Sequence, residues 1–302
     1  IVIGGHYDHL GMGGPGSSSR APDTTAVHYG ADDNASGIAS MLEIAEKFAA
    51  GNNNARSLLF AGFAAEEMGL LGSKYLVENM PVEASKVNAM INLDMIGRLK
   101  ETRLLQIGGA GTADEFTGII SRHIDTLVLQ PAISEEGYGP SDHSSFYGKD
   151  IPVLFFSTGA HLDYHTPYDT PGKINYDGLV KVSKLVYDIS AELAGKSEKL
   201  VFMEAGPKTR SNRGMGRGGV TLGIMPDFAG NIKNGLRADF VTPGRPAALG
   251  GMKKGDIITA INGKDIKNIQ DYMYRLSELK AGETIQVEII RDNEKELLLI
   301  AL

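Results

Sequence analysis

Residues 58–73, Leu-Leu-Phe-Ala-Gly-Phe-Ala-Ala-Glu-Glu-Met-Gly-Leu-Leu-Gly-Ser, form an apolar run that ends in two adjacent carboxylates and a glycine-punctuated helix start. The run has the composition of a buried strand, and burial of an unpaired carboxylate is costly. Glu66 and Glu67 therefore require a cation nearby, and divalent metal ions bind carboxylate and imidazole ligands. This hypothesis predicts that other apolar runs of the chain also end in Asp, Glu or His.

Four further segments fit this prediction. Residues 1–5 form an apolar run that leads to His6, and Asp8 follows at a spacing that suits an acceptor for the other imidazole nitrogen of His6. Asp33 opens a predicted helix, where the alternative role is that of an N-cap. Asp94 closes the apolar run 87–93, and His165 follows the run 151–157.

The order of the apolar runs predicts the fold. Strand patterns alternate with helical patterns through about residue 195, which is typical of a mostly parallel, doubly wound α/β sheet. Such sheets bind ligands beyond the carboxyl ends of their strands. Residues 201–219, rich in Gly and Arg, are predicted to be a linker. Short strand patterns follow, so the predicted domains are residues 1–200 and a small β-rich domain at 220–302.

Composition restricts the class of protein. The chain has 302 residues, a formal net charge of -7 and no cysteine. The negative charge argues against nucleic acid as the main partner, and the missing cysteines exclude a thiolate zinc site. No apolar run reaches the roughly 18 residues of a membrane span, so we expect no membrane span in this chain. Any metal must be held by His and carboxylate side chains.

Six residues then form the candidate site: His6, Asp33, Glu66, Glu67, Asp94 and His165. Five ligands and one spare carboxylate suffice for a two-metal site, in which one carboxylate bridges cations about 3.5–4 Å apart. The spare glutamate would be the general base that takes the proton of a water molecule.

At this point the sequence resembles the co-catalytic zinc aminopeptidases of the M28 type, also called aminopeptidase Y or leucyl aminopeptidase-like. The resemblance covers about residues 1–195 through the motifs GGHYDHLG, GADDNASG, FAAEEMGLLGS, NLDMIGR, GPSDHSSF and YHTPYDT, in that order. It implies a zinc exopeptidase fold, two Zn²⁺ ions per chain and the removal of N-terminal residues from peptide substrates.

The resemblance also assigns roles, position by position. It implies that Asp33 bridges the two zinc ions, with Glu67 and His165 completing one site and His6 and Asp94 the other.

It implies further that Glu66 is the general base and that Asp8 is the partner that orients His6. Tyr164 matches a tyrosine that in some members hydrogen-bonds the oxyanion.

Residues 242–266, Thr-Pro-Gly-Arg-Pro-Ala-Ala-Leu-Gly-Gly-Met-Lys-Lys-Gly-Asp-Ile-Ile-Thr-Ala-Ile-Asn-Gly-Lys-Asp-Ile, resemble a PDZ domain of the bacterial protease-associated type. Asn262-Gly263 is a tight-turn signal within this block. The resemblance implies that the backbone N–H groups of a preceding loop capture peptide C-termini. The residues that match this loop are Thr221, Leu222, Gly223 and Ile224.

Three alternatives remain beside the aminopeptidase. The M20 metallopeptidases share the ligand order but insert a lid domain, for which the predicted elements between Asp94 and His165 leave no room. Glutaminyl cyclases share the fold but use one zinc ion, and the five-ligand set favours two. The third alternative is an inactive scaffold that acts through its PDZ domain, and metal content would separate these functions.

The beginning of the sequence gives a further expectation. Family members have additional secondary structure before the GGH strand, so we expect that upstream residues have been removed from this chain. Resemblance to exported members with PDZ modules implies an export signal and a periplasmic, cell-surface or secreted location.

Overall fold

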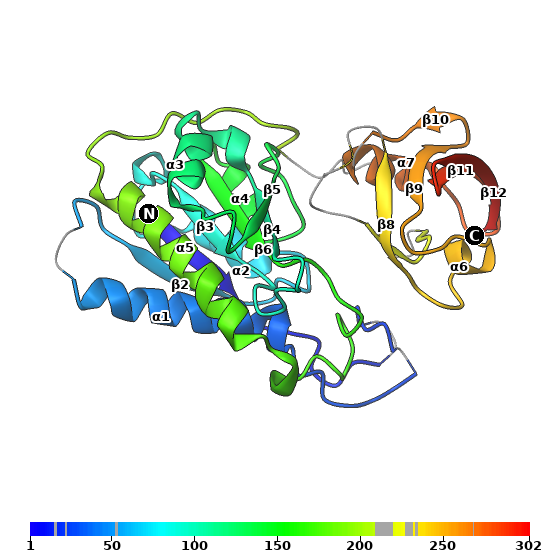
Figure 1. Ribbon diagram of the computed structural model, residues 1–302, viewed down its shortest axis with the longest axis horizontal. Coiled ribbons are helices and arrows are strands. Elements are labelled where there is room, and N and C mark those ends of the chain that lie inside the picture. Colours follow the sequence, from blue (N-terminus) through cyan, green and yellow to red (C-terminus); the bar gives the residue numbers. More distant parts are fainter. Residues whose placement is uncertain are drawn as a thin grey trace. The chain divides into compact units, whose positions relative to one another are not determined.

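The computed structural model describes residues 1–14, 17–21, 23–51, 54–208, 220–226, 232, 235–267 and 269–302. The chain divides into two compact units, Ile1–Thr209 and Arg210–Leu302 (Figure 1). Residues 209–219 of the predicted linker lie outside the described residues. Over the ranges given above, no helix combines the length and the apolar character needed to span a bilayer.

A six-stranded sheet with the order β2-β1-β3-β6-β4-β5 organises the first unit. The strands are β1 (Val2–His6), β2 (Leu59–Phe63), β3 (Met90–Leu93), β4 (Leu104–Gly108), β5 (Gln130–Ile133) and β6 (Val153–Ser157). Neighbouring strands are parallel except for β4 and β6, which pair antiparallel. The prediction of a mostly parallel α/β sheet is therefore confirmed. Because β1, β2, β3 and β6 run in one direction, their carboxyl ends lie at the same edge.

Glycine lets strand β1 approach its neighbours β2 and β3 closely. A Cβ atom added to Gly4 would lie 2.6 Å from the carbonyl oxygen of Ala61, in the neighbouring strand β2. A Cβ atom added to Gly5 would lie 2.6 Å from the carbonyl oxygen of Leu93 on the other side. Every residue of β1 is buried, including His6, which is the last residue of the strand.

Helices cover both faces of this sheet, as a doubly wound fold requires. The helices α1 (Gly37–Ala49), α3 (Glu115–His123) and α5 (Tyr176–Gly195) pack against a core that contains Ile3, Ile91 and Leu154. In Figure 1, α1 and α5 lie next to each other. The helices α2 (Leu71–Glu78) and α4 (His143–Tyr147) pack on the opposite face, around Val2, Met90 and Val153.

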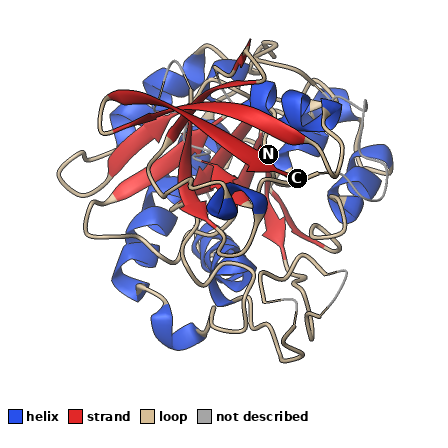
Figure 2. Ribbon diagram, turned by 90° about the vertical axis from the view of Figure 1, so that its right-hand side faces the viewer, coloured by secondary structure: helices blue, strands red, loops and turns tan. Residues whose placement is uncertain are grey.

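The second unit is an antiparallel sheet with the order β12-β11-β9-β8-β7, and β10 pairs with β9. Its strands are β7 (Ile224–Pro226), β8 (Leu236–Val241), β9 (Ile257–Ile261), β10 (Lys264–Asp265), β11 (Thr284–Arg291) and β12 (Glu294–Ala301). Two helices, α6 (Pro246–Leu249) and α7 (Ile269–Glu278), complete it. Helices and strands, blue and red in Figure 2, are joined by long tan loops in parts of the chain.

The structure differs from the sequence-based expectation in three places. Strand β5 and the short helix α4 were not predicted. Residues 201–208, predicted as linker, pack on the first unit: the hydroxyl of Tyr147 donates to the carbonyl of Gly206 at 2.6 Å and accepts from the backbone N–H of Ala205 at 2.8 Å.

Candidate metal centre

The predicted ligands gather at the carboxyl edge of the parallel strands. His6 ends β1, Asp94 follows β3, and Glu66 and Glu67 follow β2. His165 lies in the loop after β6. The residues that follow parallel strands lie at the same edge of the sheet, so segments far apart in the sequence meet here.

One group of ligand atoms contains His6, Asp33 and Asp94, and all three side chains are buried. The Nε2 atom of His6 lies 3.2 Å from Oδ1 of Asp33 and 3.5 Å from Oδ1 of Asp94. The ligand atoms of these three residues lie within 4.8 Å of one another, close enough to bind one metal ion.

A second group of ligand atoms lies on the other side of Asp33. The Nε2 atom of His165 lies 3.1 Å from Oδ2 of Asp33 and 3.1 Å from Oε2 of Glu67. A further imidazole, that of His9, also belongs to this group: His9, Asp33 and Glu67 offer ligand atoms within 4.8 Å of one another. Asp33 thus presents Oδ1 to one group and Oδ2 to the other.

The imidazoles of His6 and His165 are oriented for metal binding. The Nδ1 atom of His6 lies 3.0 Å from the carbonyl oxygen of Asp8, and Nδ1 of His165 lies 3.0 Å from the carbonyl oxygen of Ser18. A carbonyl oxygen only accepts, so Nδ1 carries the proton in each ring and Nε2 presents its lone pair to the cluster.

Two further observations show that the residues fit a metal ion. Oδ2 of Asp33 and Oδ1 of Asp94 are buried and have no hydrogen-bond partner within the described part of the chain. Burial would lower the pKa of His165, yet the carboxylates of Asp33 and Glu67 raise it to about 10. Negative charge therefore dominates the cluster, and a cation bound there would meet acceptor atoms that otherwise stay unpaired.

Asp8 contacts His6 as expected, but the hydrogen bond involves its backbone carbonyl and not its carboxylate. Its carboxylate oxygen Oδ1 lies 3.7 Å from Nδ1 of His6, whereas its backbone carbonyl accepts the hydrogen bond from this ring. The carboxylate instead accepts from the backbone N–H groups of Glu66 at 3.0 Å and Glu67 at 3.3 Å. Asp8 therefore holds two parts of the site: its carbonyl binds the ring of His6, and its carboxylate binds the backbone of Glu66 and Glu67.

Glu66 and Glu67 have different electrostatic surroundings, although they are adjacent in sequence. Burial raises the pKa of Glu66, and the neighbouring carboxylates of Asp94, Asp142 and Glu67 raise it further. By contrast, the hydrogen bonds from His165 and His9 outweigh burial at Glu67 and lower its pKa. The pKa values of the two adjacent glutamates are thus shifted in opposite directions, as expected if the residues differ in role.

Tyr164 lies against the second group. Its ring stacks on the imidazole of His165, with ring centroids 3.8 Å apart. Burial and the carboxylates of Asp33 and Glu67 raise the pKa of the phenol well above its ordinary value. The hydroxyl therefore stays protonated and can donate a hydrogen bond.

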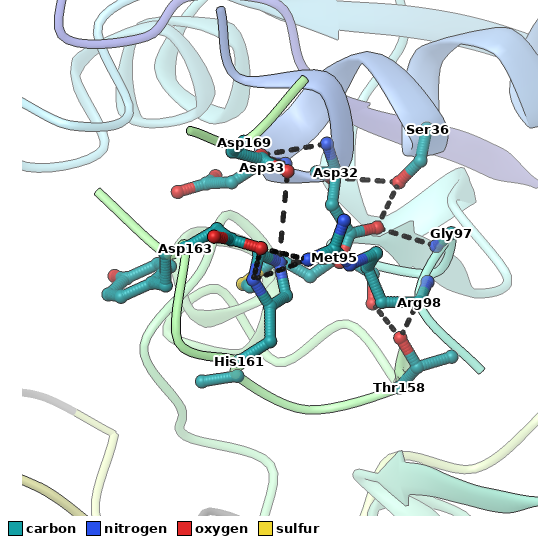
Figure 3. Close-up of polar contacts among 12 residues, drawn as sticks. Asp32, Asp33, Ser36, Met95, Gly97, Arg98, Thr158, His161, Asp163 and Asp169 are labelled. Atoms are coloured by element: carbon teal, nitrogen blue, oxygen red, sulfur yellow. Dashed lines mark hydrogen bonds and ion pairs between the residues drawn. The ribbon is translucent and has the colours of Figure 1, made fainter. Parts of the chain in front are cut away.

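A network behind Asp33 fixes its backbone (Figure 3). Oδ2 of Asp169 accepts from the backbone N–H of Asp32 at 2.8 Å and from that of Asp33 at 3.1 Å. Oδ1 of Asp32 accepts from the backbone N–H of Gly97 at 2.6 Å and from the hydroxyl of Ser36 at 3.0 Å. The backbone of Asp32 and Asp33 and the side chain of Asp32 are thus held by residues of two other loops.

His161 belongs to this network and not to the ligand set (Figure 3). Its Nε2 lies 3.2 Å from Oδ2 of Asp32, while the guanidinium of Arg98 lies 3.5 Å from its Nδ1. Arginine only donates, so Nδ1 accepts and the proton lies on Nε2, facing Asp32. Arg98 also pairs with Asp163, which Lys173 contacts at 2.6 Å.

The segment 141–143 lies beside the site without joining it. Both carboxylate oxygens of the buried Asp142 lack a hydrogen-bond partner among the described residues, and burial raises the pKa of this group to about 7. The ring of His143 stacks on Phe155 with centroids 4.6 Å apart, and burial lowers its pKa to about 3. His143 is therefore a neutral core residue.

Sequence reasoning missed one residue of the ligand groups, His9, and two residues of the network behind Asp33, Asp169 and His161. His9 stands three residues after His6, in the motif GGHYDHLG, so its position beside a ligand was a usable signal. Asp169 lies in the motif YHTPYDT, but nothing local to it indicates that its carboxylate caps the backbone 136 residues upstream. His161 gives no signal beyond its residue type.

In the second unit, the loop predicted to capture a carboxylate precedes β7. Gly223 has φ +75°, and a Cβ atom there would lie 2.3 Å from Cβ of Arg245, so the position requires glycine. The carbonyl of Leu222 accepts from the backbone N–H of Ala247 at 2.8 Å. The N–H of Gly223 donates to Oγ1 of Thr221 at 3.2 Å. Ile224 begins β7, the last strand of the sheet order.

Comparisons with known proteins agree with this architecture. Residues 1–190 match peptidase family M28 and residues 222–302 match the PDZ domain. A probable leucine aminopeptidase of Arthroderma otae is 30% identical over 204 residues, which cover 64% of this chain and 54% of that protein.

Two solved structures are similar to the first unit. The LapA aminopeptidase of Legionella pneumophila is 27% identical with a TM-score of 0.55, covering 65% of this chain and 52% of that chain. A zinc aminopeptidase from Bacillus subtilis is 25% identical with a TM-score of 0.52, and the match covers 68% of this chain and 49% of that chain.

The chain spans about half the length of the curated relatives that it matches. The family match nevertheless extends over well more than half of the chain and contains every residue of the candidate metal centre. The protein therefore belongs to peptidase family M28, and a PDZ domain follows its peptidase domain.

Proposed function

We propose that this chain removes N-terminal residues from peptides at a site that holds two zinc ions. One observation carries the proposal: the two carboxylate oxygens of Asp33 face two separate groups of ligand atoms, His6 with Asp94 and Glu67 with His165. A single cation would leave one oxygen of Asp33 and one group unused. The names of the related aminopeptidases, one of them a zinc enzyme, support the same activity.

Bound zinc ions would act as Lewis acids that polarise the scissile carbonyl and lower the pKa of a water molecule. Glu66 belongs to neither group of ligand atoms, so its carboxylate is available to take the proton of this water and pass it to the amine that leaves. The hydroxyl of Tyr164 donates a hydrogen bond to the carbonyl oxygen as negative charge develops there.

The PDZ domain would bind the C-termini of peptides. Strand β7 lies at one end of the sheet order, where an extended peptide can add a strand. The carbonyl groups of Leu222 and Gly223 are engaged by the backbone N–H groups of Ala247 and Thr242, each at 2.8 Å. These bonds fix the loop in which the peptide carboxylate would be captured.

Metal content and substrate choice test the proposed function together. We expect two zinc ions per chain, hydrolysis of peptides with a free N-terminal amine and no hydrolysis of their N-acetylated forms. Treatment with a chelator should abolish the activity, and added Zn²⁺ should restore it. One zinc ion with cyclisation of N-terminal glutamine would instead identify a glutaminyl cyclase, and an absence of bound metal would indicate a scaffold.

A further inference from the structure

His9 is the one imidazole of the metal centre to which neither the ligand set nor the proposed mechanism gives a task. Its Nδ1 lies 3.0 Å from Oε1 of Glu67 and 3.8 Å from Oδ2 of Asp33. The other oxygen of Glu67, Oε2, lies 3.1 Å from Nε2 of His165. The carboxylate of Glu67 is therefore held between two imidazoles, one on each oxygen.

The surroundings fix the ring of His9 in this place. A Cβ atom on Gly30 would lie 2.6 Å from Cγ of His9, so the glycine before the turn that carries Asp33 makes room for the ring. Gly30 also has φ +58°, a conformation that disfavours other residues. The ring lies edge-on to His165, with centroids 5.8 Å apart, and 6.4 Å from His28.

The hydrogen-bond pattern distinguishes a ligand from a residue that orients a ligand. A metal-bound imidazole normally donates its other N–H to an acceptor, as His6 and His165 do to carbonyl oxygens. The Nε2 atom of His9 is buried and finds no partner among the described residues. The proton of His9 therefore belongs on Nδ1, where Glu67 accepts it, and this nitrogen has no lone pair for a metal.

We propose that His9 is a positioning residue for the second zinc ion: its Nδ1–H donates to Oε1 of Glu67 and turns Oε2 toward Asp33 and His165. The proposal rests on the two-zinc site described above. Its consequence is selective: in the described part of the chain, no hydrogen bond, ion pair or ring contact joins His9 to His6 or Asp94, so that group keeps its own ligands. Loss of partners that orient metal ligands typically lowers metal affinity about 10–100-fold.

The test compares His9→Ala and His9→Asn with a matched control, His123→Ala. The amide nitrogen of asparagine can replace the imidazole Nδ1 as a donor, so His9→Asn keeps the hydrogen bond and His9→Ala removes it. His123 also pairs with a glutamate, Glu192, at 2.7 Å, but on the helix α3. Zinc affinities are measured by chelator competition after metal removal, and circular dichroism reports folding.

We expect His9→Ala to bind one zinc ion about 10–100-fold more weakly and the other unchanged, His9→Asn to recover most of the loss, and His123→Ala to match the unmodified chain. Unchanged affinities in His9→Ala would overturn the proposal. The proposal would also be overturned if His9→Asn lost as much zinc affinity as His9→Ala and the visible spectrum of the cobalt-substituted variants indicated one nitrogen ligand fewer. If His9→Ala does not fold, near-normal affinity in His9→Asn supports the proposal and weak affinity contradicts it.

The unmodified chain reports separately on the proposed function. Fewer than two zinc ions bound to it would contradict the two-zinc site, whereas the difference between His9→Ala and His9→Asn still measures whether the hydrogen bond to Glu67 supports the ion that is bound.

Discussion

Asp33 presents one carboxylate oxygen to His6 and the other to His165, and we propose that it bridges two zinc ions. We predict that Asp33→Ala lowers the affinity for zinc by more than 100-fold, beyond the range of about 10–100-fold for residues that only orient ligands. Elemental analysis of the purified variant measures the bound metal. Asp188→Ala, which removes a half-buried carboxylate paired with Lys184 on α5, is the control. Two zinc ions retained in Asp33→Ala would show that Asp33 is not the bridge.

Glu66 and Glu67 are adjacent in sequence but are predicted to act differently. Glu66→Gln should keep both zinc ions, because the five ligands remain, and should lower kcat about 10²–10⁴-fold through loss of the base. Steady-state kinetics with an amino-acid amide, together with metal analysis of the same preparation, measures both quantities. A variant that turns over at nearly the normal rate would disprove the assignment of the base.

At the scale of elements, the start of α1 and the end of β3 meet through Asn34. Its amide donates to the carbonyl of Leu93 at 2.8 Å and accepts from the N–H groups of Gly37 at 3.1 Å and Met95 at 3.2 Å. A Cβ atom on Gly37 would lie 2.4 Å from both Oδ1 of Asn34 and the carbonyl oxygen of Leu93. The helix can approach the strand this closely only because residue 37 is glycine.

We therefore predict that Gly37→Ala lowers the free energy of unfolding by about 1–3 kcal/mol, the usual range for overpacking. Zinc affinity should fall as well, since Asn34 is bonded to Asp33 in the chain. Chemical denaturation with and without zinc measures both effects. Gly195→Ala, at the end of α5 where a new Cβ meets no atom within 4 Å, should leave both unchanged or raise stability slightly.

Helices α3 and α5 are joined by Glu192, which pairs with Arg122 at 2.5 Å, His123 at 2.7 Å and Lys196 at 2.9 Å. The hydrogen bond from Arg122, helped by the other two partners, lowers the pKa of Glu192 to about 2. The folded state therefore binds this proton less tightly than the unfolded state. The resulting stabilisation is present above the unfolded pKa of about 4.3 and is lost as the pH falls toward 2.

Glu192→Gln should accordingly destabilise the protein at pH 7 by less than about 1 kcal/mol, because the pair is largely solvated. The difference from the unmodified chain should narrow as the pH falls below about 4.3. Urea denaturation of both proteins between pH 7 and 3 measures this trend. A difference that grows toward acid pH would contradict the assigned sign.

At the scale of the whole molecule, all five predicted ligands and Glu66 lie in the first unit. Residues 201–208 also belong to it, since Phe202 packs on Tyr147 with ring centroids 5.6 Å apart and Lys208 pairs with Asp150 at 2.7 Å. A truncation that removes the PDZ domain should therefore end after Lys208, so that these contacts are kept.

We predict that this truncation leaves kcat and KM for a short amino-acid amide nearly unchanged and raises KM for long peptides with a free C-terminus. Capture of one peptide end by the PDZ domain would raise the effective concentration of the other end at the metal centre. Long peptides with an amidated C-terminus are the control and should not distinguish the two proteins. Loss of activity on the short amide in a folded, zinc-loaded truncation would rule out simple tethering.

Much of the fold and most of the site could be predicted because their signals are local. The strand patterns before His6, Glu66 and Asp94 are continuous apolar runs, and parallel strands bring such ends together whatever the loops do. Strand β5 escaped prediction because Gln130–Ile133 is short and contains Pro131, which weakens a strand pattern. Helix α4 lies in a segment rich in Ser and Gly, whose helical form depends on packing of Phe146 and Tyr147.

The sequence by itself determined the two-unit plan, the alternation of strands and helices and the residue types able to hold metal, since these follow from pattern and spacing along the chain. Only the tertiary structure decided that the carbonyl of Asp8, and not its carboxylate, accepts the hydrogen bond of His6, and that His9 reaches Glu67. It also decided that Asp169 holds the backbone of Asp33. Hydrogen bonds between distant segments depend on directions that loops acquire only when the core has packed, and no local pattern specifies them.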